Sequence, residues 1–183
     1  TNAIEVLRSQ YKVPFIGIEP AIKPAGLASK TKKIGILATR GTLNSALFEK
    51  TSGQLDPEIE IVEQIGEGLV DLIEDGKLNT TATNQLLEKY LHPMLKQNID
   101  TLVLGCTHYP YLIPQIRSIV GNHIKIIDSG EAVARQTKKI LQLHKQIQQK
   151  KNIPRHQFYT NRDCKVLEVI LTNFPVDVKT MDF

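Results

Sequence analysis

The fold of this chain is indicated above all by a short apolar run, Thr101–Leu104, which stops at Gly105 and is followed by Cys106, Thr107 and His108. Continuous apolar runs of this kind are typical of parallel strands, because such strands are covered on both faces. Open α/β sheets bind their ligands beyond the carboxyl ends of the strands. The sequence therefore predicts a buried parallel strand whose following loop carries a candidate site.

The three polar residues of this loop have complementary chemistry. Cys106 can ionise, His108 can favour the thiolate or carry a proton, and Thr107 offers a hydroxyl and a backbone N–H to an anion. A free thiol has a pKa near ~8.5, and an adjacent positive group lowers it. The alternative is that Cys106 is a small buried apolar residue, as free cysteines often are. Its position between a strand end and a Thr-His pair favours the functional interpretation.

A second candidate site follows an earlier strand. The apolar segment Ile34–Ala38 is followed by Thr39, Arg40, Gly41 and Thr42, and helical periodicity then resumes. A strand, a turn with two hydroxyls and a helix start can form an anion-binding cradle, because helix N-termini present unpaired N–H groups. The alternative for Thr42 is an ordinary N-cap.

The hydrophobic pattern predicts regular elements along the whole chain. Helices are expected at residues 1–10, 80–98, 112–120, 131–149 and 163–174, and strands at 13–18, 33–38, 59–65, 101–104, 124–127, 157–160 and 176–181. The segment 19–25 contains two prolines and predicts a loop, followed by a linker at 26–33. The repeated order of strand, loop and helix predicts the α/β class.

Composition narrows the function classes. The chain has 183 residues, of which 41% are hydrophobic and 23% are charged, as in ordinary globular proteins. The net charge of +4 would permit nucleic-acid binding, but the basic excess has little aromatic interleaving and predicts a solvated helix face and loop. This excess comprises Lys138, Lys139, Lys145, Lys150, Lys151 and Arg155. We therefore expect no nucleic-acid partner.

The cysteines and the apolar runs indicate the compartment. Cys106 and Cys164 lie far apart, without metal-ligand spacing or a secreted disulfide pattern, so we expect reduced thiols and no metal. No apolar run approaches the roughly 20 residues that a membrane span needs, and no signal-peptide pattern is visible. A cytoplasmic protein without a membrane partner is expected. Cys164, near a helix start, is interpreted as structural.

Three segments resemble one known family. Residues 105–110, Gly-Cys-Thr-His-Tyr-Pro, closely resemble the second cysteine motif of glutamate racemases, in the aspartate/glutamate racemase family. Residues 38–42, Ala-Thr-Arg-Gly-Thr, resemble the family's Ala-Thr-x-Gly-Thr motif, whose threonines contact the substrate carboxylate. Glu74, before Asp75 and Gly76, matches the family's glutamate that orients the histidine of the cysteine loop. From the residues alone, Glu74 is more simply an exposed carboxylate at a helix end.

The resemblance implies an activity and a role for each matching residue. The expected reaction is cofactor-independent interconversion of L- and D-glutamate by two cysteines, supplying D-glutamate for peptidoglycan. The implied catalytic residues are Cys106, His108 and Glu74, and the implied substrate-binding residues are Thr39, Thr42, Thr107 and His108. The implied partner is glutamate, with no cofactor and with a possible homodimer.

The resemblance also implies a two-domain fold with parallel sheets flanked by helices. Residues 1–25 would be a remnant of the first domain, residues 26–129 the second α/β domain that carries Cys106, and residues 130–183 a return to the first domain. The family's first cysteine motif, Cys-Asn-Thr-Ala, is absent from the sequence. We therefore expect an incomplete first domain and a fragment that is inactive alone.

Three other functions compete with this one. Aspartate racemase has the same architecture and paired cysteines. A binding or regulatory α/β module would keep the anion cradle without chemistry. A hydrolase with a cysteine nucleophile would need an aligned base and an oxyanion hole, and nothing in the sequence marks a third orienting group beside Cys106 and His108.

Overall fold

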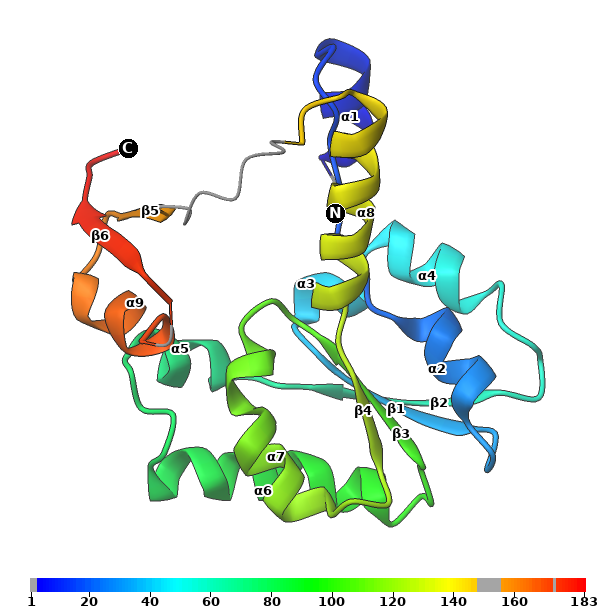
Figure 1. Ribbon diagram of the computed structural model, residues 1–183. Helices are drawn as coiled ribbons and strands as arrows, with labels where there is room; N and C mark the ends of the chain where they lie inside the picture. The colour runs from blue at the N-terminus through cyan, green and yellow to red at the C-terminus, as the bar shows by residue number, and fades with distance from the viewer. Residues whose placement is uncertain (1–2, 148–155, 173) are drawn as a thin grey trace.

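The computed structural model describes residues 3–147, 156–172 and 174–183 and contains two parallel sheets (Figure 1). The larger sheet has the strand order β2-β1-β3-β4 and the smaller one pairs β5 with β6. The strands are β1 (Lys33–Ala38), β2 (Glu60–Ile65), β3 (Thr101–Gly105), β4 (Lys125–Ile127), β5 (His156–Thr160) and β6 (Val176–Thr180). The predicted α/β class with parallel sheets flanked by helices is confirmed.

Helices connect the strands and cover both faces of the larger sheet. They are α1 (Ile4–Gln10), α2 (Ile22–Ala28), α3 (Arg40–Leu43), α4 (Ala46–Ser52), α5 (Leu69–Glu74), α6 (Thr81–Leu95), the 3₁₀ helix η1 (Tyr109–Leu112), α7 (Ile113–Val120), α8 (Gly130–Leu143) and α9 (Cys164–Ile170). Helices α6 and α7 lie on one side of the larger sheet, and α2 and α4 lie on the other (Figure 1).

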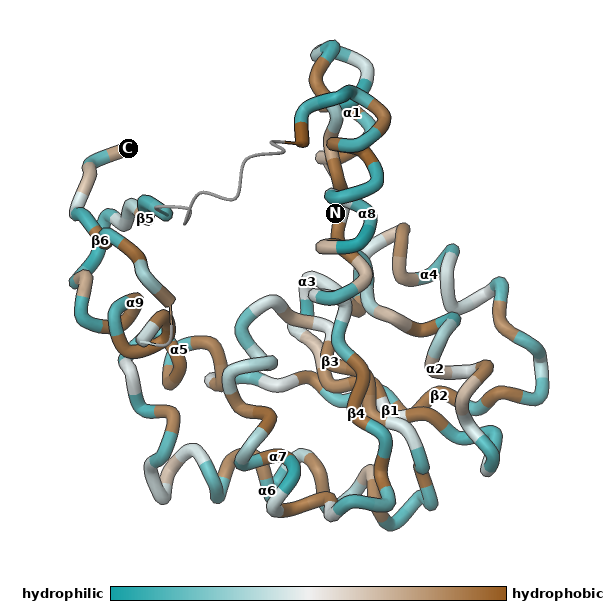
Figure 2. The backbone as a smooth tube through the Cα atoms, in the orientation of Figure 1, coloured by the Kyte–Doolittle hydropathy of each residue, from teal (hydrophilic) through white to brown (hydrophobic). Residues whose placement is uncertain are grey.

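Alternation along the strands divides the core into two layers, because successive side chains of a strand point to opposite faces. Ile34 and Ile36 of β1 pack with residues of α2 and α4, whereas Leu37 packs with residues of α5, α6 and α7. On β3, Val103 joins the first layer and Leu102 joins the second. Figure 2 shows the resulting concentration of hydrophobic residues along β1, β3 and β4. This two-sided burial explains the continuous apolar runs of β1 and β3.

The strand order indicates where a ligand would bind, at the carboxyl ends of β1 and β3. From β1 the chain crosses to β2 on one side, and it later returns to β3 on the other side of β1. The loops that follow β1 and β3 therefore diverge at a topological switch point, where open α/β sheets bind ligands. Both predicted polar loops lie at this place.

Two predictions about the first 33 residues are wrong. Residues 13–18 pair with none of the described strands. The carbonyl of Phe15 accepts a hydrogen bond from Arg8 Nη2 at 2.9 Å. The predicted loop and linker contain the helix α2. Pro24 does not break this helix because it lies in the first turn, where its missing N–H is not needed. Ile22 and Ala25 bury the inner face of α2 against the sheet.

The last predicted helices are shorter in the structure. Helix α8 ends at Leu143, two residues before Lys145 adopts a φ of 55°, a conformation that ends helices. Helix α9 ends at Ile170. The predicted basic linker at residues 150–155 lies outside the described residues. Among the residues that the structure describes, no helix is long and apolar enough to cross a membrane.

Candidate active site

The turn after β1 forms the predicted cradle. Thr39, and not Thr42, is the N-cap of α3, since its Oγ1 accepts a hydrogen bond from the backbone N–H of Thr42 at 3.3 Å. The two threonine hydroxyl oxygens lie 3.0 Å apart. Both side chains are half-buried. The turn thus presents two adjacent hydroxyls at the carboxyl edge of the sheet.

The cysteine loop begins where β3 comes closest to β1. A Cβ atom on Gly105 would lie 2.6 Å from Cβ of Ala38, so only glycine fits between the two backbones. The next residue, Cys106, is half-buried, and its Sγ accepts a hydrogen bond from the backbone N–H of His108 at 3.5 Å. Sγ also lies 3.9 Å from Nδ1 of the His108 ring. The close packing of the strands therefore fixes the start of the loop that carries the thiol.

The environment of Cys106 favours its neutral form. Burial raises the pKa of the Cys106 thiol, and the backbone N–H groups of His108 and Tyr109 oppose this rise only in part. Burial acts in this direction because it penalises the charged thiolate. At neutral pH the side chain is therefore mainly a thiol, which can give a proton, and it needs a base or a positive charge to become a thiolate.

His108 links the thiol to a carboxylate. Its Nε2 lies 2.7 Å from Oε1 of Glu74, and the two side chains are 33% and 36% exposed. A carboxylate that accepts from Nε2–H leaves Nδ1 of the neutral ring with a lone pair, and this atom faces Cys106 Sγ. The arrangement can carry a proton between sulfur and ring nitrogen.

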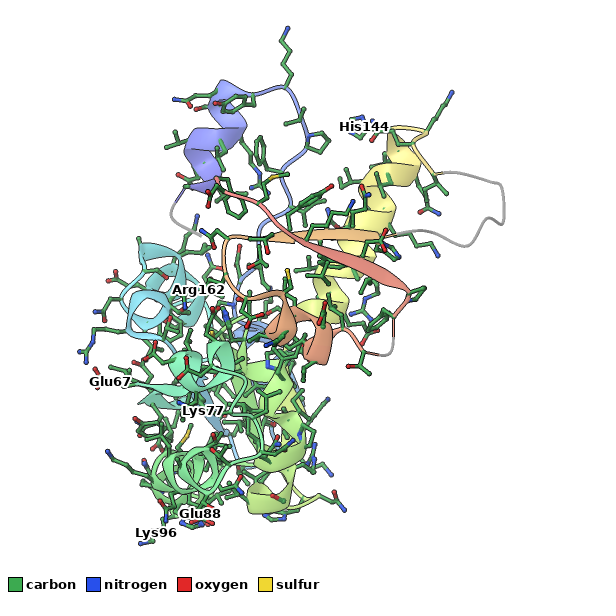
Figure 3. The ribbon with its side chains drawn as sticks, turned by 90° about the vertical axis from the view of Figure 1, so that its left-hand side faces the viewer. Glu67, Lys77, Glu88, Lys96, His144 and Arg162 are labelled. Atoms are coloured by element: carbon green, nitrogen blue, oxygen red, sulfur yellow. The ribbon has the colours of Figure 1, made fainter. Side chains whose placement is uncertain are left out.

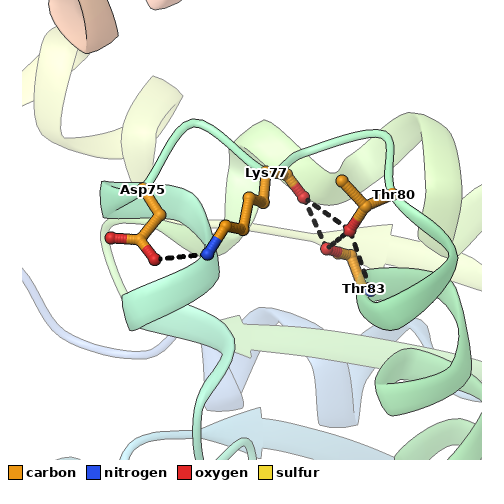
Figure 4. A network of polar contacts seen from close by, with 4 residues as sticks. All are labelled: Asp75, Lys77, Thr80 and Thr83. Atoms are coloured by element: carbon orange, nitrogen blue, oxygen red, sulfur yellow. Dashed lines mark hydrogen bonds and ion pairs between the residues drawn. The ribbon is translucent and has the colours of Figure 1, made fainter.

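Glu74 is held in place by the loop that follows it. Asp75, the C-cap of α5, forms an ion pair with Lys77, whose Nζ lies 2.8 Å from Asp75 Oδ2. The carbonyl of Lys77 accepts hydrogen bonds from the hydroxyls of Thr80 and Thr83 at the start of α6 (Figure 4). The end of α5 is thereby attached to the N-terminus of the long helix α6, one face of which is buried in the core.

Two tyrosines fix the other end of α5. Tyr109 Oη donates to the carbonyl of Gly66 at 2.9 Å, and Tyr90 Oη donates to the carbonyl of Glu67 at 2.8 Å. Because Tyr109 directly follows His108, this contact sets the position of α5, and hence of Glu74, relative to the cysteine loop.

Two cavities flank the cysteine loop. A cavity of about 270 Å³ is lined by Cys106 together with Thr39 and Thr42. A larger cavity of about 490 Å³ is lined by Glu74 and His108 on one side and by residues of the β5–α9 segment on the other. Thr107 lines both cavities. The structure therefore brings all six predicted site residues around these two cavities, and Cys106 lines the smaller one.

Several residues that were not predicted as site residues also line these cavities. Asp128, Ser129 and Glu19 also line the smaller cavity, where the Ser129 hydroxyl donates to the carbonyl of Glu19. Asp128 and Ser129 follow strand β4, so the rule that sites lie at strand ends could have found them. Arg162, which lines the larger cavity, has no local signal in the sequence.

Cys164 lies elsewhere. Cys164 is the first residue of α9, and its Sγ lies 3.2 Å from Oγ1 of Thr180 in β6. Both cysteines are free thiols in the described structure. Within the described ranges, no group of three or more His, Cys, Asp or Glu side chains could hold a metal ion.

Fold and site together define an α/β protein in which a thiol, a histidine–glutamate pair and two threonine hydroxyls meet at the switch point of a parallel sheet. Comparison with known families identifies the class to which such a protein belongs. Residues 1–137 match the family described as Asp/Glu/Hydantoin racemase, and the chain belongs to this family.

Individual relatives agree with this assignment. The chain is 43% identical over 163 residues to a protein named glutamate racemase from Cupriavidus pinatubonensis, an alignment that covers 89% of this chain and 60% of the relative. A crystal structure of a glutamate racemase isoform from Bacillus anthracis superposes with a TM-score of 0.80 at 31% identity, covering 98% of this chain and 69% of the other. An Escherichia coli glutamate racemase, solved with L-glutamate and the activator UDP-MurNAc-Ala, superposes with a TM-score of 0.77 at 25% identity over 97% and 68% of the two chains. The present chain thus spans about 60% of the length of the Cupriavidus relative.

Proposed function

We propose that this polypeptide takes part in the cofactor-independent interconversion of L- and D-glutamate, with Cys106 as one of two groups that exchange the α-proton. One observation carries the proposal: Cys106, Thr39 and Thr42 line the same cavity of about 270 Å³. An amino acid whose carboxylate binds the hydroxyls would have its α-carbon within reach of the sulfur.

The proposed chemistry is a proton transfer on each face of the substrate. The Cys106 thiolate takes the α-proton, the electron pair of the C–H bond remains on the α-carbon and is delocalised into the carboxylate, and a second acid returns a proton from the opposite face. Each acid or base must lie within hydrogen-bond reach of the carbon. His108 would hold the thiol proton at Nδ1 before the transfer, and Glu74 would keep the ring in the tautomer that this requires.

The resemblance assigns the second acid to a cysteine of the other domain. We also propose the domain division expected from the sequence, with residues 1–25 and 130–183 belonging to a first domain and residues 26–129 forming the second. The second boundary is supported by residues 128–130, which line the smaller cavity at the place where the chain would leave the second domain. At the first boundary, helix α2 (Ile22–Ala28) already packs on the larger sheet.

The relatives favour glutamate over aspartate, because the proteins compared with this chain are named glutamate racemases and one was solved with L-glutamate. A supply of D-glutamate for peptidoglycan, a cytoplasmic site of action and a possible homodimer follow from the same resemblance and belong to the proposal. Two free thiols are consistent with a reducing compartment.

A protection experiment on the 183-residue chain tests binding at the proposed site. Iodoacetamide labelling of Cys106 is followed by mass spectrometry, with Cys164 as the internal control thiol. Glutamate is expected to slow labelling of Cys106 but not of Cys164, and Thr39→Val is expected to weaken the protection. Equal labelling with and without glutamate would refute the proposal, and stronger protection by aspartate would assign the site to aspartate.

A second experiment tests the chemistry on the polypeptide as its gene encodes it. Deuterium uptake at the α-carbon from heavy water is measured for each enantiomer, in the wild type and in Cys106→Ala. The variant is expected to lose racemisation and to exchange the α-proton of one enantiomer only. Equal residual exchange of both enantiomers would contradict a two-base mechanism, and protection without any exchange in the wild type would indicate a binding module.

A further inference from the structure

The carboxylate of Glu74 has a second charged neighbour, from the C-terminal part of the chain. Oε1 of Glu74 contacts His108, and Oε2 lies 3.8 Å from Nη1 of Arg162. Arg162 lies between strand β5 and helix α9 and lines the 490 Å³ cavity together with Glu74 and His108. In Figure 3, Arg162 lies above Lys77 and Glu67. Each oxygen of one carboxylate thus meets a different nitrogen-bearing side chain.

The two aspartates next to this contact in the sequence each have a lysine partner. Asp75 lies next to Glu74 but pairs with Lys77 at 2.8 Å (Figure 4). Asp163 lies next to Arg162 and has Lys165 at 4.0 Å. After Lys77, Arg162 also helps to hold the pKa of Asp75 below its usual value. Within the described residues, the ion pair that Arg162 forms is with Glu74.

The contact continues a chain of polar groups that ends at the reactive sulfur. From Arg162 the chain passes through the two oxygens of Glu74 to Nε2 of His108, and Nδ1 of the same ring lies 3.9 Å from Cys106 Sγ. A carboxylate that is held by two partners has less freedom to rotate away from the histidine, and groups that orient a functional histidine in this way influence its chemistry. The guanidinium also adds a positive charge to the lining of the larger cavity, which Glu74 and His108 share.

We propose that Arg162 is a positioning residue, which holds Glu74 and, through it, sets the orientation of His108 beside Cys106. This inference deepens the proposed function, since it adds a residue of the C-terminal segment to the same proton-transfer site. It has a structural consequence: the site at the end of β3 is fully ordered only while the β5–α9 segment is docked on α5.

The test measures the reactivity of the thiol in the 183-residue chain without any substrate. Arg162→Gln is expected to slow iodoacetamide labelling of Cys106 at pH 8 by about two- to fivefold, the range for one exposed ion pair. Arg162→Lys is expected to restore most of the rate, because a single contact at 3.8 Å needs a charge and not the bidentate geometry of arginine. Circular dichroism confirms that each variant is folded.

Arg135→Gln is the matched control. Arg135 is an exposed arginine that also pairs with a glutamate, Glu131, at 2.6 Å on helix α8, so its replacement causes the same change in net charge. In Arg135→Gln, Cys106 is expected to be labelled at the same rate as in the wild type. Added salt is expected to narrow the difference between wild type and Arg162→Gln, because salt screens exposed charges.

A double variant distinguishes an effect through Glu74 from a direct effect on the sulfur. In a Glu74→Gln background, Arg162→Gln is expected to change the labelling rate no further. The proposal is overturned if Arg162→Gln labels as fast as Arg135→Gln, or if its effect is undiminished without the Glu74 carboxylate. Because no ligand is present, these results are independent of whether glutamate protects Cys106, so failure of the proposed function and failure of this inference are distinguishable.

Discussion

Two opposing influences act on the pKa of the Cys106 thiol: burial raises it, and nearby N–H donors lower it. The pH dependence of its reactivity should reveal which influence is stronger. Burial raises the pKa of its thiol above the ordinary value despite the N–H groups of His108 and Tyr109. The thiolate is the nucleophile in alkylation, so the labelling rate of Cys106 is expected to rise at a higher pH than that of a free thiol such as glutathione. The measurement is the labelling rate as a function of pH.

The control is the same chain unfolded in urea, in which Cys106 should become reactive at the pH of an ordinary thiol. The folded state holds the proton more tightly than the unfolded chain. Ionisation of this thiol therefore does not change the free energy of unfolding at neutral pH. It lowers the free energy of unfolding as the pH rises through the range where the thiol of the unfolded chain ionises. Full thiolate reactivity at pH 7 in the folded chain would contradict the argument.

The contact between Glu74 and His108 should matter more for activity than for stability. Glu74→Gln removes the charge opposite Nε2 of His108, and loss of such an orienting partner typically costs about 10- to 100-fold in activity. Because both side chains are about one-third exposed, the loss of stability is expected to stay below about 1 kcal/mol. Activity and urea unfolding of the intact protein measure the two effects.

Glu67→Gln is the control for this prediction. Glu67 is 77% exposed and forms an ion pair with Arg40 at 3.8 Å. Its replacement should leave activity unchanged. An equal loss of activity in both variants would show that the effect of Glu74→Gln is electrostatic at long range and not specific to His108.

At the scale of residues, the sequence predicted those site residues that lie next to one another in the chain, because adjacent polar residues form a recognisable motif. Cys106, Thr107 and His108 are consecutive, and Thr39 and Thr42 lie within one turn. Arg162 could not be found in this way. It lies 88 positions from Glu74 in the sequence, and only the docking of α9 beside α5 brings the two side chains together.

Among the elements, the packing of β1 against β3 gives the sharpest prediction. Gly105→Ala would place a methyl group 2.6 Å from Cβ of Ala38, between two buried strands that cannot both keep their positions. Overpacking of this kind costs about 1–3 kcal/mol, and the displaced end of β3 should also move Cys106. Urea unfolding and the labelling rate of Cys106 measure these two consequences.

Gly41→Ala is the matched control, since its Cβ would meet no described atom within 4 Å and its φ is not in the left-handed region. Its stability should change little or rise slightly, because alanine favours the helical backbone of α3. If Gly105→Ala were as stable as Gly41→Ala, the two strands would have to separate more easily than their burial indicates.

The elements that the sequence predicted well are those whose own residues specify the burial. Strands β1 and β3 are buried on both faces, so their apolar runs mark them within one residue of the observed bounds. Residues 13–18 have a similar composition but no described strand beside them, and pairing with a neighbour is not encoded locally. The helix α2 was missed because Pro24 was taken as a helix breaker, although it lies in the first turn.

In the whole molecule, the buried core is confined to the larger sheet and its helices. Both clusters of buried apolar residues lie between Ile22 and Ile124. Within the described parts of the chain, α1, α8, α9, β5 and β6 contain no residue that is fully buried. The stability of these peripheral elements therefore depends on a few contacts, of which that between Arg162 and Glu74 is one.

This distribution predicts how the native chain opens. All five residues of β3 are buried and the strand is paired on both sides, whereas β5 and β6 form an isolated pair of half-exposed strands. Two-stranded sheets are marginal alone, and regions with few buried contacts open locally at low free energy. In hydrogen-exchange mass spectrometry, β5 and β6 are expected to exchange about 100-fold faster than β3 or more, a difference of about 3 kcal/mol. Equal protection of β3 and β5 would instead require both sheets to unfold as one cooperative unit, and the Arg162 contact would then be present whenever the chain is folded.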